Sequence, residues 1–145
     1  MDSSRNLLHE NLIRRMKKIF DDRQDLAILD LWCAQGDFLS RLHDEWFPFL
    51  FGTDWFRECT LPFVEFKKSL FTQKLDYQNE SFDVIFFLDV YEHLWDPMSI
   101  VTEIHRILKK DGICVITTPN ISSIFWRISF LLTGKLWWFQ DQYVV

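Results

Sequence analysis

Acidic, histidine and hydroxyl side chains that could bind a ligand stand at the ends of four short apolar runs. These groups are Asp30 with the loop 32–36, then Asp54, then Asp89 with Glu92 and His93, and finally the TTPN sequence at 117–120. A carboxylate at the end of a strand can accept hydrogen bonds from both hydroxyls of a ribose. A loop that leads into a helix presents free amides to an anionic group. The pattern predicts a ligand with a ribose and a carboxylate or phosphate, although Asp54 could instead cap the next helix.

Elements that must position these groups follow from the spacing of apolar residues. Apolar runs predict strands at 27–31, 49–54, 82–88 and 113–117, with another strand at either 63–66 or 69–72. Helical spacing predicts helices over 4–20 and 36–47, and a third that begins at Pro97 and continues to 108. Asp111 and Gly112 are expected to end that third helix. Strands that alternate with helices predict an α/β fold with a mostly parallel sheet covered on both sides.

The first helix is predicted to be amphipathic. Its expected apolar face consists of Leu8, Leu12 and Ile19, together with Met16 or Phe20. The basic run at 14–18 is interpreted as a solvated helix face rather than a binding patch.

Composition limits the class of protein. The chain has 145 residues, which fits a single domain, and its net charge of −5 argues against a nucleic-acid partner. Cys33, Cys59 and Cys114 form no CxxC pair, so neither a disulfide framework nor a metal site is expected, and a reducing cytoplasm is indicated. The chain contains seven Trp and fifteen Phe but only four Gly, so a fold that needs several glycines in tight turns must place other residues there.

Four segments resemble the class I S-adenosylmethionine-dependent methyltransferases. Residues 27–42 (AILDLWCAQGDFLSRL) resemble that family's first strand, glycine loop and first helix, and FGTD at 51–54 resembles its second strand with the ribose-binding acid. Residues 81–97 (SFDVIFFLDVYEHLWDP) and 107–120 (ILKKDGICVITTPN) resemble its fourth strand, the following helix and the fifth strand. The resemblance implies a Rossmann-like three-layer sandwich with about five strands and S-adenosylmethionine as the cofactor.

The resemblance also implies a role for each matched position. The implied cofactor-binding residues are Asp30, Leu31, Trp32, Cys33, Ala34, Gly36, Asp54, Trp55, Asp89 and Val90. Among these, the loop 32–36 is expected beneath the methionine part of the cofactor, and Asp54 is expected to hold its ribose. Glu92 and His93 are expected to face the acceptor. His93 is the candidate general base because an imidazole titrates near neutral pH; the alternative is a histidine that fixes the loop by hydrogen bonding.

Three features depart from the family pattern. Trp32 and Ala34 stand at glycine positions, where alanine is expected to fit only with a negative φ and the indole is expected in or beside the cofactor pocket. No acid occurs between Glu65 and Asp76, where the family has one that contacts adenine, and Phe71 lies near that position. The family's two strands beyond the fifth are missing, so an exposed apolar edge open to self-association is expected.

These departures leave several hypotheses for function. Methyl transfer to a small-molecule acceptor by direct displacement is the predicted function. The alternative is an inactive or fragmentary module that serves as a binding or partner domain. A further hypothesis is that some Trp positions, Trp32 included, correspond to glycine in the natural protein. A nicotinamide-dependent dehydrogenase is disfavoured because the loop lacks G-x-G-x-x-G.

The apolar segment 121–139 has three interpretations. It covers the acceptor pocket, lies on a membrane interface as a peripheral contact, or packs against the sheet edge. The predicted organisation is one domain, 1–145, with an N-terminal helix in 1–22, a cofactor-binding core in 27–120 and an apolar segment in 121–145.

Overall fold

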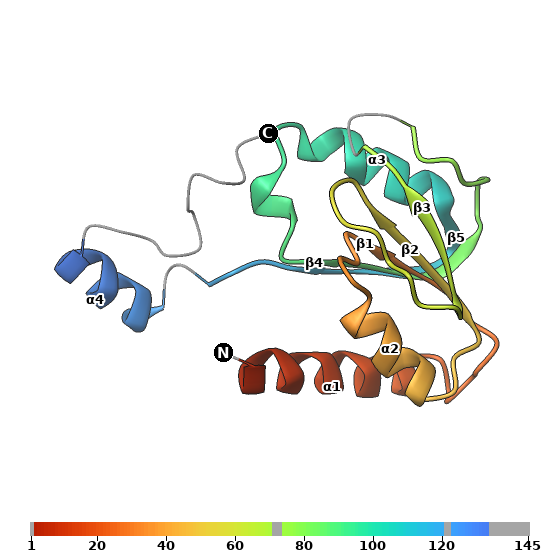
Figure 1. Cartoon of the computed structure of the whole chain (residues 1–145), viewed down its shortest axis with the longest axis horizontal. Helices are drawn as coiled ribbons and strands as arrows, with labels where there is room; N and C mark the ends of the chain where they lie inside the picture. Colours follow the sequence, from red (N-terminus) through yellow and green to blue (C-terminus); the bar gives the residue numbers. More distant parts are fainter. Residues whose placement is uncertain (1, 71–73, 121–122, 134–145) are drawn as a thin grey trace.

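The computed structural model describes residues 2–70, 74–120 and 123–133 (Figure 1). Its elements in chain order are α1 (Asp2–Ile19), β1 (Ala27–Leu31), α2 (Asp37–Asp44), β2 (Phe49–Asp54), β3 (Val64–Lys68), β4 (Phe82–Leu88), the 3-10 turn η1 (Tyr91–His93), α3 (Pro97–Ile107), β5 (Leu108–Thr117) and α4 (Ile124–Thr133). The strands form one parallel sheet in the order β3-β2-β1-β4-β5. The predicted Rossmann-like fold with a five-stranded parallel sheet is therefore confirmed.

Helices cover both faces of the sheet. Figure 1 shows α1 and α2 on one side and α3 on the other. One buried cluster joins Met16 of α1 and Leu39 of α2 to Phe86 of β4, and a second joins Ile104 of α3 to Leu29 of β1 and Ile85 of β4. Residues alternate between the two faces along each strand, and both faces are buried, which explains why all residues of β4 except Asp83 are apolar and all except Leu88 are buried.

The boundary between α3 and β5 differs from the prediction. The helix ends at Ile107, and the strand begins at Leu108 rather than at residue 113. Leu108 pairs with Phe82 across a register shift in β4, and the Lys109 ammonium donates to the Asp83 carboxylate at 2.7 Å. A Cβ at Gly112 would lie 3.0 Å from the backbone oxygen of Asp83, so this glycine permits close approach of two strands and does not end the helix.

Two other predicted features are confirmed in part. On α1, Met16 is buried and Leu12 and Phe20 pack against the same core cluster, as expected, whereas Ile19 is 59% exposed. The buried stripe also includes His9 and Ile13, so it is shifted from the predicted one. The uncertain third strand lies at Val64–Lys68, close to the first of its two predicted positions.

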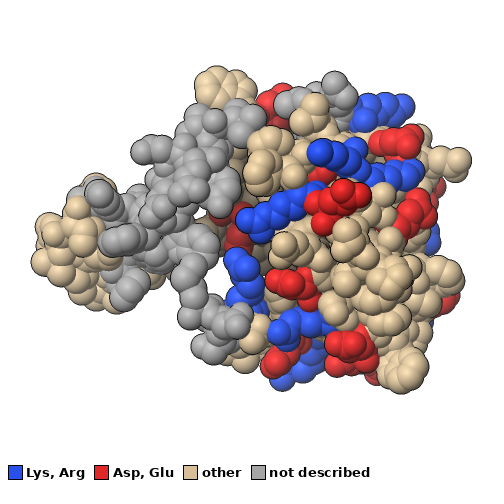
Figure 2. Space-filling view, in the orientation of Figure 1, with Lys and Arg blue, Asp and Glu red and all other residues tan. Residues whose placement is uncertain are grey.

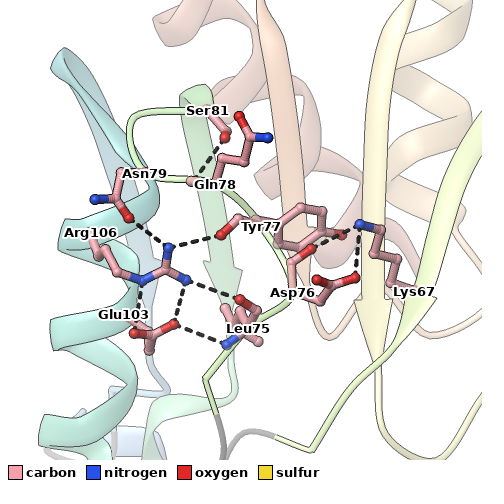
Figure 3. Close-up of polar contacts among 9 residues, drawn as sticks. All are labelled: Lys67, Leu75, Asp76, Tyr77, Gln78, Asn79, Ser81, Glu103 and Arg106. Atoms are coloured by element: carbon pink, nitrogen blue, oxygen red, sulfur yellow. Dashed lines mark hydrogen bonds and ion pairs between the residues drawn. The ribbon is translucent and has the colours of Figure 1, made fainter.

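The connection between β3 and β4 is anchored by Arg106 near the end of α3 (Figure 3). Its guanidinium donates to the backbone oxygens of Leu75 and Tyr77 at 3.0 and 2.8 Å, and to both carboxylate oxygens of Glu103 at 3.0 and 2.7 Å. Glu103 in turn accepts the backbone N–H of Leu75 at 2.9 Å. Hydrogen bonding to Arg106 lowers the pKa of the Glu103 carboxyl. This network fixes an irregular segment to a helix that follows it in the chain.

Apolar side chains are exposed at one end of the described chain. Within the described ranges β5 pairs only with β4 and so forms a sheet edge, where Ile116 is 47% exposed. Leu131 and Leu132 of α4 are 82% and 77% exposed. Among the described residues, no helix is both long enough and apolar enough to cross a bilayer. Residues 121–122 and 134–139 of the predicted apolar segment lie outside the described residues.

Candidate functional site

The ligand-binding side chains predicted from sequence meet at one edge of the sheet. β1 lies between β2 and β4, with Leu31 level with Thr53 on one side and with Phe87 on the other. The loops that follow these three parallel strands therefore emerge beside one another. In Figure 1 the amino-terminal half of α1 reaches the same end of the sheet as η1.

The loop after β1 is held closely against β2. The backbone N–H groups of Trp32 and Cys33 both donate to the Thr53 carbonyl oxygen, at 2.7 and 2.9 Å. Left-handed φ angles occur at Trp32 (75°), Ala34 (50°) and Gly36 (91°). These are the three positions at which the resembled motif has glycine. All three have the left-handed backbone that glycine favours, although only Gly36 is glycine. Ala34 does not meet the negative-φ condition expected of it.

Gly36 is the glycine that this loop requires most strictly. A Cβ at this position would lie 2.5 Å from the Leu61 Cδ1 atom and 2.7 Å from the Cys59 sulfur. Gly36 is also the N-cap of α2, and no side chain caps this helix end. The first amides of α2 therefore lack a side-chain acceptor and are suited to an anionic group.

Asp54 at the end of β2 has no exposed surface, and it joins two loops. One carboxylate oxygen accepts the backbone N–H groups of Phe56 and Arg57 at 2.7 and 2.8 Å, and the other accepts that of Ala34 at 3.0 Å. Asp54 therefore caps a turn, not a helix as the alternative interpretation expected, and it also supports the loop after β1. Its expected role in holding a ribose stays a prediction. A carboxylate can accept about four hydrogen bonds, so one place is left for a ligand hydroxyl.

Asp30 is buried one strand away from Asp54. Burial raises the pKa of the Asp30 carboxyl well above its usual range, and the nearby Asp54 carboxylate adds to this effect. Burial likewise raises the pKa of the Cys33 thiol. The Cys33 sulfur would lie 2.7 Å from a Cβ at Gly52, so its side chain packs over β2. These side chains, with the fully buried Leu31, support the loop from within the core.

Trp32 and Trp55 form an aromatic pair beside the site. Their rings meet edge to face with centroids 6.2 Å apart, and both are partly buried against the cluster on the α3 side of the sheet. The sequence predicted the Trp32 indole in or beside the pocket. In the structure the indole lies against Trp55, the residue that follows Asp54.

The end of β4 supplies a third group of polar side chains. Asp89 has a left-handed φ of 54°, and its carboxylate accepts the Thr117 hydroxyl at 2.8 Å, which joins β4 to β5. Val90 is buried. The Nε2 atom of His93 lies 4.0 Å from a carboxylate oxygen of Glu92, and both Glu92 oxygens are buried without a hydrogen-bond partner. Among the described residues, no cluster of three or more His, Cys, Asp or Glu could hold a metal ion.

One polar residue near this edge was not predicted from the sequence. His9 of α1 is 8% exposed, its ring lies 4.8 Å from that of Phe38 in the first turn of α2, and its Nδ1 atom is buried without a partner. A polar residue four positions before Ile13 and seven before Met16, on the buried stripe of α1, is the signal that could have revealed it.

In the sheet, β1 lies between β2 and β4, and the candidate ligand-binding side chains lie at the carboxyl ends of the strands. This arrangement defines a Rossmann-like domain of the kind that binds nucleoside-containing cofactors. A family model described as a methyltransferase domain matches residues 4–143. The chain therefore belongs to the methyltransferase domain family, whose cofactor is S-adenosylmethionine.

Individual relatives agree with this assignment. The ubiquinone biosynthesis O-methyltransferase of Ruegeria is 30% identical over 108 residues, covering 66% of this chain and 42% of the enzyme. A protein of Pyrococcus horikoshii has the same fold, with a TM-score of 0.68 at 23% identity over 90% of this chain and 65% of that one. A SAM-dependent methyltransferase of Aquifex aeolicus matches with a TM-score of 0.62 at 17% identity over 87% and 77%. The chain spans only 17–42% of the curated relatives it matches.

Proposed function

We propose that this chain binds S-adenosylmethionine at the carboxyl ends of β1, β2 and β4 and that it methylates a small-molecule acceptor. The observation that carries the proposal is the loop 32–36, whose left-handed residues lead into the uncapped amino end of α2 beside Asp54. A cofactor with one carboxylate and one ribose needs an anion site and a hydroxyl acceptor, and these two features supply them.

The residues present fit this cofactor. The free amides of α2 match its carboxylate, the remaining hydrogen-bonding capacity of Asp54 matches a ribose hydroxyl, and the Trp32–Trp55 pair offers an apolar wall next to Asp54. Because Asp54 has no exposed surface, a hydroxyl reaches it only when the turn at Phe56 and Arg57 gives way. We therefore expect cofactor binding to rearrange this turn.

The chain's own residues have three tasks in the reaction. When bound, the cofactor would supply a methyl group on a positively charged sulfur, and an acceptor atom would form a bond to the methyl carbon while the carbon–sulfur bond breaks and S-adenosylhomocysteine leaves. The α2 amides and Asp54 fix the position of that methyl group, and positioning provides much of the rate of such a displacement. An acceptor hydroxyl must also lose a proton, which His93 can take if its imidazole faces the acceptor. The Trp32–Trp55 pair would shield the bound cofactor from water.

A small-molecule acceptor is favoured over nucleic acid by charge. The net charge is −5, and Figure 2 shows basic and acidic side chains intermixed over one face. The Ruegeria relative is named as an O-methyltransferase, which supports an oxygen acceptor for this chain as well. Peripheral membrane contact through 121–139 and self-association at the β5 edge remain predictions, to be tested by liposome co-sedimentation and sedimentation equilibrium.

A thermal-shift titration with S-adenosylhomocysteine tests the proposal. A ligand at 100 times its Kd stabilises the folded state by about 2.7 kcal/mol, a shift of several degrees in a domain of this size. NADH, the ligand of the disfavoured dehydrogenase, is the control and should give no shift. Transfer of labelled methyl from S-adenosylmethionine to simple phenols then tests catalysis, with His93→Gln expected to lower kcat but not cofactor affinity. Absence of any shift with S-adenosylhomocysteine in folded protein would leave the inactive module as the explanation.

A further inference from the structure

His9 of α1 is a polar side chain whose burial the fold alone does not explain. It is more than nine-tenths buried, and its Nδ1 atom is enclosed without a hydrogen-bond partner. Buried polar atoms are nearly always paired, and an exception calls for a functional explanation such as a missing ligand. An apolar residue at this position would pack against Phe38 without leaving a nitrogen unpaired.

The position of His9 relates it to the start of α2. Its ring contacts Phe38, the second residue of α2, and Phe38 in turn contacts Phe86 of β4 with centroids 4.6 Å apart. The Arg41 guanidinium of α2 donates to the Asn6 side-chain oxygen of α1 at 2.6 Å, which holds the two helices together one turn before His9. His9 thus packs against the side chain of a residue in the first turn of α2, whose amino end has no side-chain cap.

The charges around His9 keep its imidazole neutral. Burial lowers the pKa of His9 below its usual value, as do the cations Arg41 and Arg5, and the carboxylates Asp37 and Asp89 oppose them more weakly. A neutral imidazole has one nitrogen that donates and one that accepts, so it can pair with either end of a zwitterion. Asp37 begins α2 and Asp89 follows β4, so the two carboxylates that act on His9 come from the elements that border the anion site.

We propose that His9 is a cofactor-binding residue whose Nδ1 atom hydrogen-bonds the α-amino-acid end of S-adenosylmethionine. The inference rests on the proposed function, since it assumes that the cofactor's carboxylate lies at the amino end of α2. It extends the site to α1, an element that precedes every motif of the Rossmann-like core.

Two ligands that differ only in the amino-acid end provide the test. S-adenosylhomocysteine contains it, whereas 5′-methylthioadenosine has the same nucleoside and sulfur without it. Their dissociation constants are measured by calorimetry for the wild type, His9→Phe and His9→Asn. Phenylalanine keeps the packing against Phe38 and removes both nitrogens, whereas asparagine offers a polar atom near the place of Nδ1. His43→Phe is the matched control, because His43 stacks on Phe63 at 3.8 Å at the far end of α2.

The expected result is selective. His9→Phe raises the Kd for S-adenosylhomocysteine about tenfold, the size of one net hydrogen bond, and leaves that for 5′-methylthioadenosine within about twofold. His9→Asn recovers part of the loss, and His43→Phe changes neither constant. Equal weakening of both ligands in His9→Phe, or no weakening, overturns the assignment of His9 while leaving cofactor binding intact. A wild type that binds neither ligand overturns the proposed function, and the assignment of His9 with it.

Discussion

Replacing Ala34 by glycine is expected to stabilise the protein. Ala34 has a φ of 50°, in the left-handed region, where a Cβ crowds the following carbonyl oxygen. The backbone N–H of Ala34 donates to Asp54, and glycine keeps that donor. The substitution therefore removes backbone strain and retains the hydrogen bond.

The magnitude follows from two opposing free energies. Relief of the left-handed conformation contributes about 1–2 kcal/mol. The greater freedom of glycine in the unfolded chain costs about 0.4–1 kcal/mol. The net expectation is a gain of about 0.5–1 kcal/mol in the free energy of unfolding, or a rise in Tm of about 1–4 °C.

Ala27, the only other alanine of the chain, is the matched control. It lies at the start of β1, outside the left-handed region, so Ala27→Gly should lower stability by about 0.5–1 kcal/mol. Urea denaturation of both variants, with the same m-value required of each, measures the two changes. Loss of stability in Ala34→Gly equal to that in Ala27→Gly would refute the view that the loop 32–36 is strained.

Three further predictions concern the same site and its support. Asp30→Asn should raise stability near neutral pH, because folding raises the pKa of the Asp30 carboxyl. The stability that the protonated carboxyl contributes is complete below its unfolded pKa and is lost as pH rises towards its folded pKa. In urea titrations, the advantage of the variant over the wild type should therefore vanish below about pH 4. Gly36→Ala should cost more than about 2 kcal/mol, measured as a lower urea midpoint, because a Cβ would lie 2.5 Å from Leu61 at a φ of 91°; an unchanged midpoint would contradict the close packing described. Arg106→Met should cost about 2–3 kcal/mol by leaving buried carbonyl groups unpaired. Arg106 lowers the pKa of Glu103, so the wild type should lose some stability as pH falls through the folded pKa of Glu103. Arg106→Met should remove this pH-dependent loss, and a pH profile of stability identical to that of the wild type would argue against the coupling of the two residues.

The sheet and the location of the site were predictable because they depend on local patterns. A run such as Phe82–Leu88 has no polar stripe and is too short for a typical helix, which indicates a strand buried on both faces, and Pro97 marks the first turn of a helix. Acids at strand ends then fall at one edge of any parallel sheet. The start of β5 was not predictable, because Asp111 and Gly112 form an ordinary helix stop. The strand begins earlier because Lys109 pairs with Asp83, which is distant in sequence.

The details of the site depend on contacts between distant elements. Alanine at position 34 was expected to fit only with a negative φ, but the residue keeps the left-handed φ of the glycine that it replaces in the motif, in a loop held by hydrogen bonds to Thr53 and Asp54. His9 was missed for a similar reason: the stripe of α1 that becomes buried is chosen by the position of α2. Residue types and spacing therefore predict where a ligand binds, while tertiary packing decides which atoms meet it.

The central place of β1 in the sheet has a consequence for synthesis of the chain. β1 and β2 leave the ribosome early and can pair at once, but the other edge of β1 is complementary to β4, which is made about fifty residues later. At ~5–20 residues per second, this edge stays unpaired for roughly 3–10 s. Its apolar residues, and those of the paired β2, form an open template for wrong partners during that interval. Nascent chains halted between β3 and β4 should therefore bind a holdase chaperone, and chains extended past β5 should release it.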